Sequence, residues 1–172
     1  ASLVMAPYVD GDMVRTVDAV KAHQQQSAES FYETVALVQG KNTKQMVECF
    51  KTYIDLKINL IGFSYKSKRL ETLRMLHDLE LLQSRETYFL FGFSVLRELY
   101  QISALGEWEW LLSTGVPIKA ALEEQEINPE YISTSEIYDQ GEGVRLSPRQ
   151  MFSATWNISK LQNFLPKSDH EN

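Results

Sequence analysis

An aromatic stretch from Arg85 to Leu112 constrains the fold of this chain more than any other segment. It contains two of the three Trp residues and three of the eight Phe residues of the sequence. In its second half, Leu96, Leu99 and Tyr100 recur at helical spacing, and charged or polar residues occupy the opposite side. We therefore predict one helix from about residue 85 to about residue 113, with other helices packed around it.

The front half of this stretch leaves a second interpretation open. Thr87 to Leu96 is rich in aromatic residues, which also favour a buried strand. The two interpretations differ in where they place Trp108 and Trp110. On a helix these side chains point about 200° apart, whereas on a strand they share one face.

Most of the remaining sequence also shows apolar residues at spacings of three or four. The helical segments begin near Val14, Met46, Leu70 and Met151, and a short one follows Pro117. Asn42 or Thr43 is a suitable N-cap for the second segment, and Ser147 followed by Pro148 has the cap-then-proline order that opens a helix. The predicted fold is all-α, an antiparallel bundle of five to seven helices with at least two long ones.

The length of 172 residues fits a single helical domain. Residues 1–9 have no period and are predicted to form a loose arm. Residues 120–146 are predicted to form a turn-rich acidic excursion, because seven acidic residues and no basic one occur from Ala120 to Gly143. We expect a final helix over 147–165 and a disordered tail over 167–172.

Charge and cysteine content restrict the partners and the compartment. A net charge of −6 argues against direct binding to nucleic acid, which needs a positive surface. No apolar run is long enough to span a membrane. The single cysteine, Cys49, excludes an intrachain disulfide, so we expect an intracellular, cytoplasmic location.

The sequence contains no recognisable catalytic motif. Gly141-Glu-Gly143 lacks the third glycine of a dinucleotide-binding turn. The three His residues have no second His or Cys at metal-ligand spacing. We therefore predict no catalytic residue, no cofactor and no metal, and expect the protein not to be an enzyme.

Two groups of residues are candidate contacts for a protein partner. The only concentrated positive charge comprises Lys66, Lys68, Arg69 and Arg74, which form either a solvated helix face or a docking site for an acidic partner. Trp108 and Trp110 either fill the core or provide one exposed anchor, since Trp is enriched at the energetic centres of interfaces.

Three functional hypotheses remain. The first is a non-enzymatic interaction module, an adaptor or a self-assembling scaffold subunit, most simply a homo-oligomer. The alternative is a helical sensor or carrier that binds an apolar small molecule or lipid in a pocket lined by Tyr88, Phe89, Phe93 and Tyr100, whose Tyr hydroxyls would orient the ligand. The third is an enzyme that uses residues dispersed along the sequence.

Overall fold

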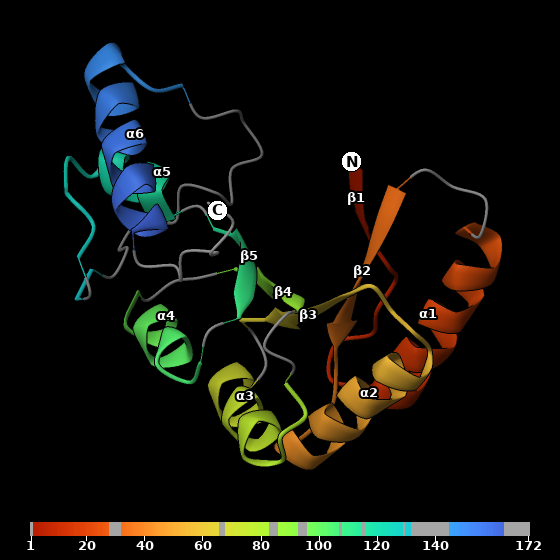
Figure 1. Ribbon diagram of the computed structural model, residues 1–172. Coiled ribbons are helices and arrows are strands. Elements are labelled where there is room, and N and C mark those ends of the chain that lie inside the picture. Colours follow the sequence, from red (N-terminus) through yellow and green to blue (C-terminus); the bar gives the residue numbers. More distant parts are fainter. Residues whose placement is uncertain are drawn as a thin grey trace, which may run out of the picture. The chain divides into compact units, whose positions relative to one another are not determined.

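A computed structural model shows an α/β protein, so the prediction of an all-α bundle is wrong (Figure 1). The structure describes residues 2–27, 32–65, 68–82, 86–92, 96–106, 108–114, 116–128, 130–131 and 145–163. Within these residues, five strands and six helices alternate along most of the chain. No helix in this part of the chain is long and apolar enough to cross a membrane.

The strands form one parallel, curled sheet. They are β1 (Ser2–Met5), β2 (Tyr32–Val38), β3 (Leu60–Ser64), β4 (Thr87–Phe91) and β5 (Glu109–Ser113). The helices are α1 (Met13–Ser27), α2 (Thr43–Asp55), α3 (Arg69–Asp78), α4 (Leu96–Ser103), α5 (Val116–Leu122) and α6 (Pro148–Gln162). The order of the strands in the sheet is their order in the sequence, β1-β2-β3-β4-β5.

The chain divides into two compact units, which are described separately. Unit 1 comprises residues 1–91 and 108–112, and unit 2 comprises residues 92–107 and 113–172. Unit 1 contains α1, α2, α3 and nearly the whole sheet, and unit 2 contains α4, α5 and α6.

The central aromatic stretch is not one helix. It forms β4, then α4, then β5. β4 and β5 are strands of five residues each, and alternate side chains of β4 are buried and half-buried. Apolar residues therefore occur on both faces of β4, which imitates a helix that is apolar all round. Trp108 and Trp110 are both buried, with ring centroids 5.9 Å apart, as expected for alternate residues on one face of an extended segment.

Three other predicted boundaries are also corrected. α2 ends at Asp55, and Leu60 and Ile61 belong to β3 rather than to the same helix. Residues 32–38 form β2 and do not continue the helical segment that begins near Val14. Ser2–Met5 form β1 rather than a loose arm, because β1 pairs with β2 in parallel, with Met5 opposite Val35.

The two faces of the sheet in unit 1 have different surroundings. On one face, Phe63 and Tyr88 pack on Phe50 of α2, with ring centroids 6.0 and 6.1 Å away. The other face carries a buried apolar cluster of Val35, Leu37 and Leu60, with Met5, Phe89, Phe91 and Leu111 partly buried around it. Gly62 belongs to this second face by alternation, and a Cβ there would lie 2.6 Å from Leu37 Cδ2.

In unit 2, α6 packs against α5. One buried polar residue of α6, Asn157, forms hydrogen bonds to α5 and to the segment that follows it. Asn157 Oδ1 accepts the backbone N–H of Ile127 at 3.0 Å, and Asn157 Nδ2 donates to the carbonyls of Pro117 and Gln125 at 3.3 and 3.2 Å. Ser147 caps α6 in a capping box, in the order that the sequence predicts.

The sequence predicts an apolar stripe of Met151, Thr155, Ile158, Leu161 and Leu165 for the last helix, and of these only Leu161 is buried within the part of the helix that the structure describes. The buried residues of α6 are Ala154, Asn157 and Leu161, whereas Met151 and Ile158 are exposed. The prediction favoured the bulkiest apolar residues, but the small Ala154 and the hydrogen-bonded Asn157 are those that let α6 approach its neighbours closely.

Candidate ligand site at the carboxyl edge of the sheet

A parallel sheet places the carboxyl ends of its strands along one edge. In unit 1 this edge carries residues 6–12 after β1, residues 39–42 after β2, and Tyr65 after β3. The strand order never reverses, which is the winding of βα barrels and not of doubly wound sheets. In βα barrels, ligands bind at the carboxyl edge, so this edge is the first place to look for a site.

Gln39, which directly follows β2, is the most unusual residue at this edge. Its side chain is buried, with 2% of its surface exposed. Its Oε1 accepts the backbone N–H of Gly11 at 3.0 Å, while its Nε2 is buried and has no hydrogen-bond partner within the described residues. Buried polar atoms are almost always paired, so an unpaired amide nitrogen at this place calls for an explanation.

The loop after β1 is held by two side-chain contacts. Thr16, buried in the first turn of α1, accepts the N–H of Val9 at 2.9 Å and donates to the carbonyl of Val9 at 3.0 Å. Gln39 holds Gly11, whose φ of +69° favours glycine. Asp10 lies between these two contacts, and its exposed carboxylate is presented at the carboxyl edge.

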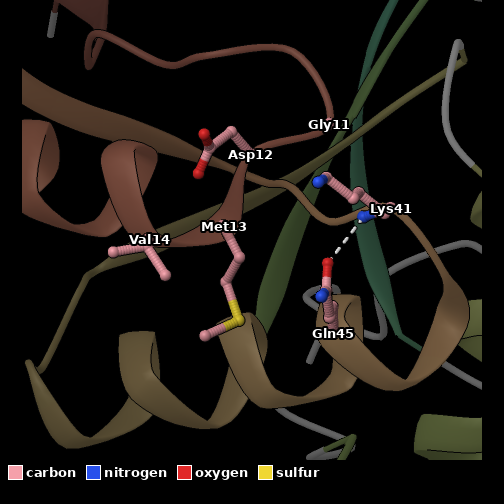
Figure 2. A pocket seen from close by; sticks show the side chains of 6 residues that line it. All are labelled: Gly11, Asp12, Met13, Val14, Lys41 and Gln45. Carbon is pink, nitrogen blue, oxygen red and sulfur yellow. Dashed lines mark hydrogen bonds between the residues drawn. The ribbon is translucent and has the colours of Figure 1, made fainter.

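A shallow pocket of about 170 Å³ lies beside this loop (Figure 2). It is lined by Gly11, Asp12, Met13, Val14, Lys41 and Gln45. The backbone N–H of Lys41 donates to Gln45 Oε1 at 2.9 Å, and Asn42 caps α2 by accepting the N–H of Gln45 at 3.0 Å. The pocket thus lies between the amino-terminal turns of α1 and α2 and carries one acidic and one basic side chain.

The turn after β2 is packed tightly against α2. A Cβ at Gly40 would lie 2.8 Å from the backbone nitrogen of Met46, so the turn requires glycine. Tyr53 donates its hydroxyl to the carbonyl of Leu37 at 3.0 Å. These contacts fix the backbone on both sides of Gln39.

Cys49, on α2, helps to hold the backbone at Gln39, and its thiol is not a reactive nucleophile. Burial raises the pKa of its thiol, and a hydrogen bond with the backbone of Gln39 works in the opposite direction. A buried thiol with a raised pKa is a weak nucleophile. Burial likewise raises the pKa of Tyr53.

A larger pocket of about 310 Å³ lies at the opposite edge of unit 1. It is lined by Ile54, Lys57, Ile58, Asn59, Ile61, Glu86, Thr87 and Tyr88. None of these lining residues has a buried side-chain nitrogen or oxygen without a hydrogen-bond partner, although Nε1 of Trp110, whose ring centroid lies 5.6 Å from that of Tyr88, is unpaired within the described residues. The amino-terminal edge of such sheets usually serves stability, so the carboxyl edge is the better candidate despite its smaller pocket.

The four basic residues singled out from the sequence do not form one surface. Lys66 lies outside the described residues, and Lys68 and Arg74 are exposed, with Lys68 Nζ 3.8 Å from Glu71 Oε2. Arg69 is buried, and its Nη1 donates to the carbonyls of Phe63 and Phe91, both at 3.3 Å. Arg69 therefore braces the carboxyl ends of β3 and β4 and is not part of a solvated helix face.

The aromatic candidates are also dispersed. Trp108 and Trp110 are buried within unit 1, so neither presents an exposed anchor there. Tyr88 and Phe89 are adjacent on β4 and point to opposite faces. Tyr100 is a partly exposed residue of α4 in unit 2, and Phe93 lies outside the described residues.

The sequence analysis did not identify Gln39 or Gly11. The usable signal was a polar residue followed by glycine directly after the apolar run Val35 to Val38. That pattern marks the end of a buried strand, but it is informative only once the run is recognised as a strand.

No protein-family model and no curated protein matches this chain in the comparisons made. The interpretation of the site therefore rests on its geometry. Among the residues that the structure describes, no three His, Cys, Asp or Glu side chains come together where they could hold a metal ion.

Proposed function

We propose that unit 1 binds a small polar molecule at the carboxyl edge of its sheet, and that Gln39 donates a hydrogen bond to it from Nε2. The observation that carries this proposal is the buried amide nitrogen without a partner, at the edge where βα sheets bind ligands. The ligand is expected to present a hydrogen-bond acceptor, such as a carbonyl oxygen or a carboxylate.

Entry of such a ligand requires the segment around Gly11 to move, because Gln39 is covered there, whereas the bonds between Thr16 and Val9 can stay in place. The bond between Gln39 and Gly11 is a single neutral hydrogen bond, worth about 1 kcal/mol, and its loss is a small part of a typical binding energy. Gly11 can absorb the backbone change because it lacks a Cβ. Asp10, on the same loop, would then lie close to the bound molecule.

This proposal changes the hypotheses drawn from the sequence. The interaction-module hypothesis rested partly on long helices and on aromatic residues gathered in one helix, and the α/β fold removes that part of its support. The function itself stays a prediction. The small-molecule hypothesis is kept, with Gln39 and the loop after β1 in place of the four aromatic candidates. The expectation that the protein is not an enzyme also stays a prediction.

Two broader predictions stay proposals as well. Binding to a protein partner or to a second copy of the chain stays a proposal. A cytoplasmic location is proposed from the single cysteine, Cys49. Cell fractionation of the tagged full-length protein tests this location. Finding the protein in an oxidising compartment would contradict the proposal.

Screening of a library of small polar compounds by ligand-observed NMR tests the binding proposal. Compounds with an exposed acceptor should bind the wild-type protein and lose binding in Gln39→Met. The matched control is Gln25→Met, the same replacement at an exposed position of α1. The proposal fails if no compound binds, or if the compounds that bind do so equally well in Gln39→Met.

A further inference from the structure

The pocket beside the loop after β1 carries two opposite charges that do not pair with each other. Asp12 and Lys41 both line it, from the start of α1 and the segment before α2 (Figure 2). Neither side chain forms an ion pair within the described residues. Each of them is therefore able to bind an opposite charge on a ligand.

The two sides of this pocket differ in their electrostatics. On the α1 side, Asp12 Oδ1 accepts the backbone N–H of Arg15 at 3.1 Å, which leaves Oδ2 able to accept from a ligand. On the other side, α2 begins after the neutral cap Asn42 and has no acidic residue in its first turn. The positive end of the α2 dipole and the ammonium of Lys41 therefore favour an anionic group there.

The rest of the pocket wall is partly apolar, and the pocket is small. Met13 and Val14 line it from the first turn of α1, and Val14 is 64% exposed. The volume of about 170 Å³ lies below the roughly 300–1,000 Å³ of sites for drug-sized ligands. These features favour a small molecule with two opposite charges and a short apolar part.

We infer that the ligand of the proposed site is a free α-amino acid with an apolar side chain, an inference that rests on the proposed function above. Its carboxylate binds at Lys41 and the first turn of α2, and its ammonium group binds at Asp12. Its side chain packs on Met13 and Val14. A simple anion would be repelled by Asp12 and a simple cation by Lys41, whereas a zwitterion satisfies both charges.

The same pocket is joined to the unpaired amide of Gln39. Gly11 lines the pocket and donates its N–H to Gln39 Oε1 at 3.0 Å, and Lys41 follows Gln39 by two residues. Movement of the segment around Gly11 therefore opens Gln39 Nε2 toward the pocket. The carboxylate of the amino acid is then the acceptor that Gln39 Nε2 lacks.

Dissociation constants from NMR titrations of the ¹⁵N-labelled full chain test this inference. The probes are leucine, isocaproate, which lacks the amino group of leucine, and isoamylamine, which lacks its carboxylate. Leucine should bind at least about tenfold more tightly than either analogue, the usual effect of a hydrogen bond between charged groups. Asp12→Asn, which retains a good helix cap, should weaken leucine binding to the same degree but not the binding of isocaproate. Lys41→Met should weaken the binding of both.

Asp18→Asn and Lys21→Met are the matched controls, because they make the same charge changes at exposed positions of α1 outside the pocket. The inference is overturned if leucine does not bind, or if Asp12→Asn and Lys41→Met bind it as tightly as the controls do. Binding of isocaproate that depends on Gln39 and is as tight as that of leucine would overturn the inference alone and leave the proposed function standing. Binding of leucine that depends on Asp12 and Lys41 but is unchanged in Gln39→Met would instead contradict the proposed role of Gln39 and support the ligand class.

Discussion

The side-chain oxygen of Gln39 accepts the backbone N–H of Gly11 at 3.0 Å, and these residues are 28 positions apart in the sequence. This contact joins the loop after β1 to the end of β2, and it leaves the amide nitrogen of Gln39 without a partner in the described residues. One side chain therefore both closes the loop and carries the unused donor on which the proposed site depends.

Removal of the Gln39 amide should affect stability little. Gln39→Met loses the bond to Gly11 but also removes an unpaired buried donor, so the free energy of unfolding should stay within about 1 kcal/mol of wild type. Thr16→Val, which loses both bonds to Val9 and leaves the N–H of Val9 without its partner, should cost about 1–3 kcal/mol. Urea unfolding followed by Trp fluorescence measures both. A larger loss in Gln39→Met than in Thr16→Val would show that Gln39 has a purely structural role.

Gly62 should not tolerate a side chain. Gly62→Ala places a Cβ 2.6 Å from Leu37 Cδ2 and 3.3 Å from Phe89 Cδ1, and we expect a loss of about 1–3 kcal/mol from overpacking. Adding Leu37→Val removes the closer of these contacts, so the second substitution should cost less in the Gly62→Ala background than alone. Thermal unfolding of the four proteins measures this coupling, and strictly additive losses would contradict the packing described here.

Asn157 should be essential for the stability of unit 2. Asn157→Ala leaves the N–H of Ile127 and the carbonyls of Pro117 and Gln125 without their partner, and we expect a loss of about 2–4 kcal/mol. Asn163→Ala, at the exposed end of α6, is the matched control and should change little. Hydrogen exchange of the α5 and α6 amides reports on this unit directly. Unchanged protection in Asn157→Ala would be inconsistent with this role.

The ion pair between Glu126 and Lys160 should affect the titration of the Glu126 carboxyl at acidic pH. A hydrogen bond from Lys160, 2.6 Å away, and the positive charge of Lys160 lower the pKa of Glu126. Because the folded-state pKa is depressed, the pair contributes stability above the ordinary carboxyl pKa, and this contribution is lost as the pH falls through the folded-state value. In Lys160→Met, the Glu126 carboxyl measured by NMR should titrate closer to 4.5. Lys44→Met is the control, and an unchanged titration in Lys160→Met would contradict the pairing.

The sequence predicted several helices, and it indicated a strand only as the alternative interpretation of residues 87–96, where β4 lies. Asn42 does cap α2, and Ser147 does cap α6, because capping depends on local residues that the sequence displays directly. The strands were missed because they are short and apolar on both faces, with no alternation to reveal a period of two. Leu60 to Ser64 could therefore be read as the end of the preceding helix.

One short sequence pattern occurs twice in the chain and indicates strands. Leu60-Ile61-Gly62-Phe63-Ser64 is similar to Leu90-Phe91-Gly92-Phe93-Ser94. In the structure, the first copy is β3, and β4 ends at Phe91 within the second copy. A short apolar run that ends in glycine and recurs between helical segments is typical of βα units.

The site itself was beyond the reach of sequence patterns. Gln39, Gly11 and Thr16 come together only because β1 and β2 are neighbours in a parallel sheet. The polar residue and the glycine after the apolar run Val35 to Val38 mark the end of a strand, but they do not show that the Gln39 side chain is buried or that its Nε2 has no partner among the described residues.

The most direct test of the central claim is an NMR titration that follows the side-chain amide of Gln39 in uniformly ¹⁵N-labelled protein. Any compound found in the library screen is added to the wild-type protein, and the spectrum is compared with that of Gln39→Met to assign the resonance. The proposed site predicts that the Gln39 side-chain NH₂ signals and the backbone signals of Gly11 and Lys41 shift together on binding. Shifts confined to Lys57, Glu86 and Thr87, at the opposite edge of unit 1, would contradict it.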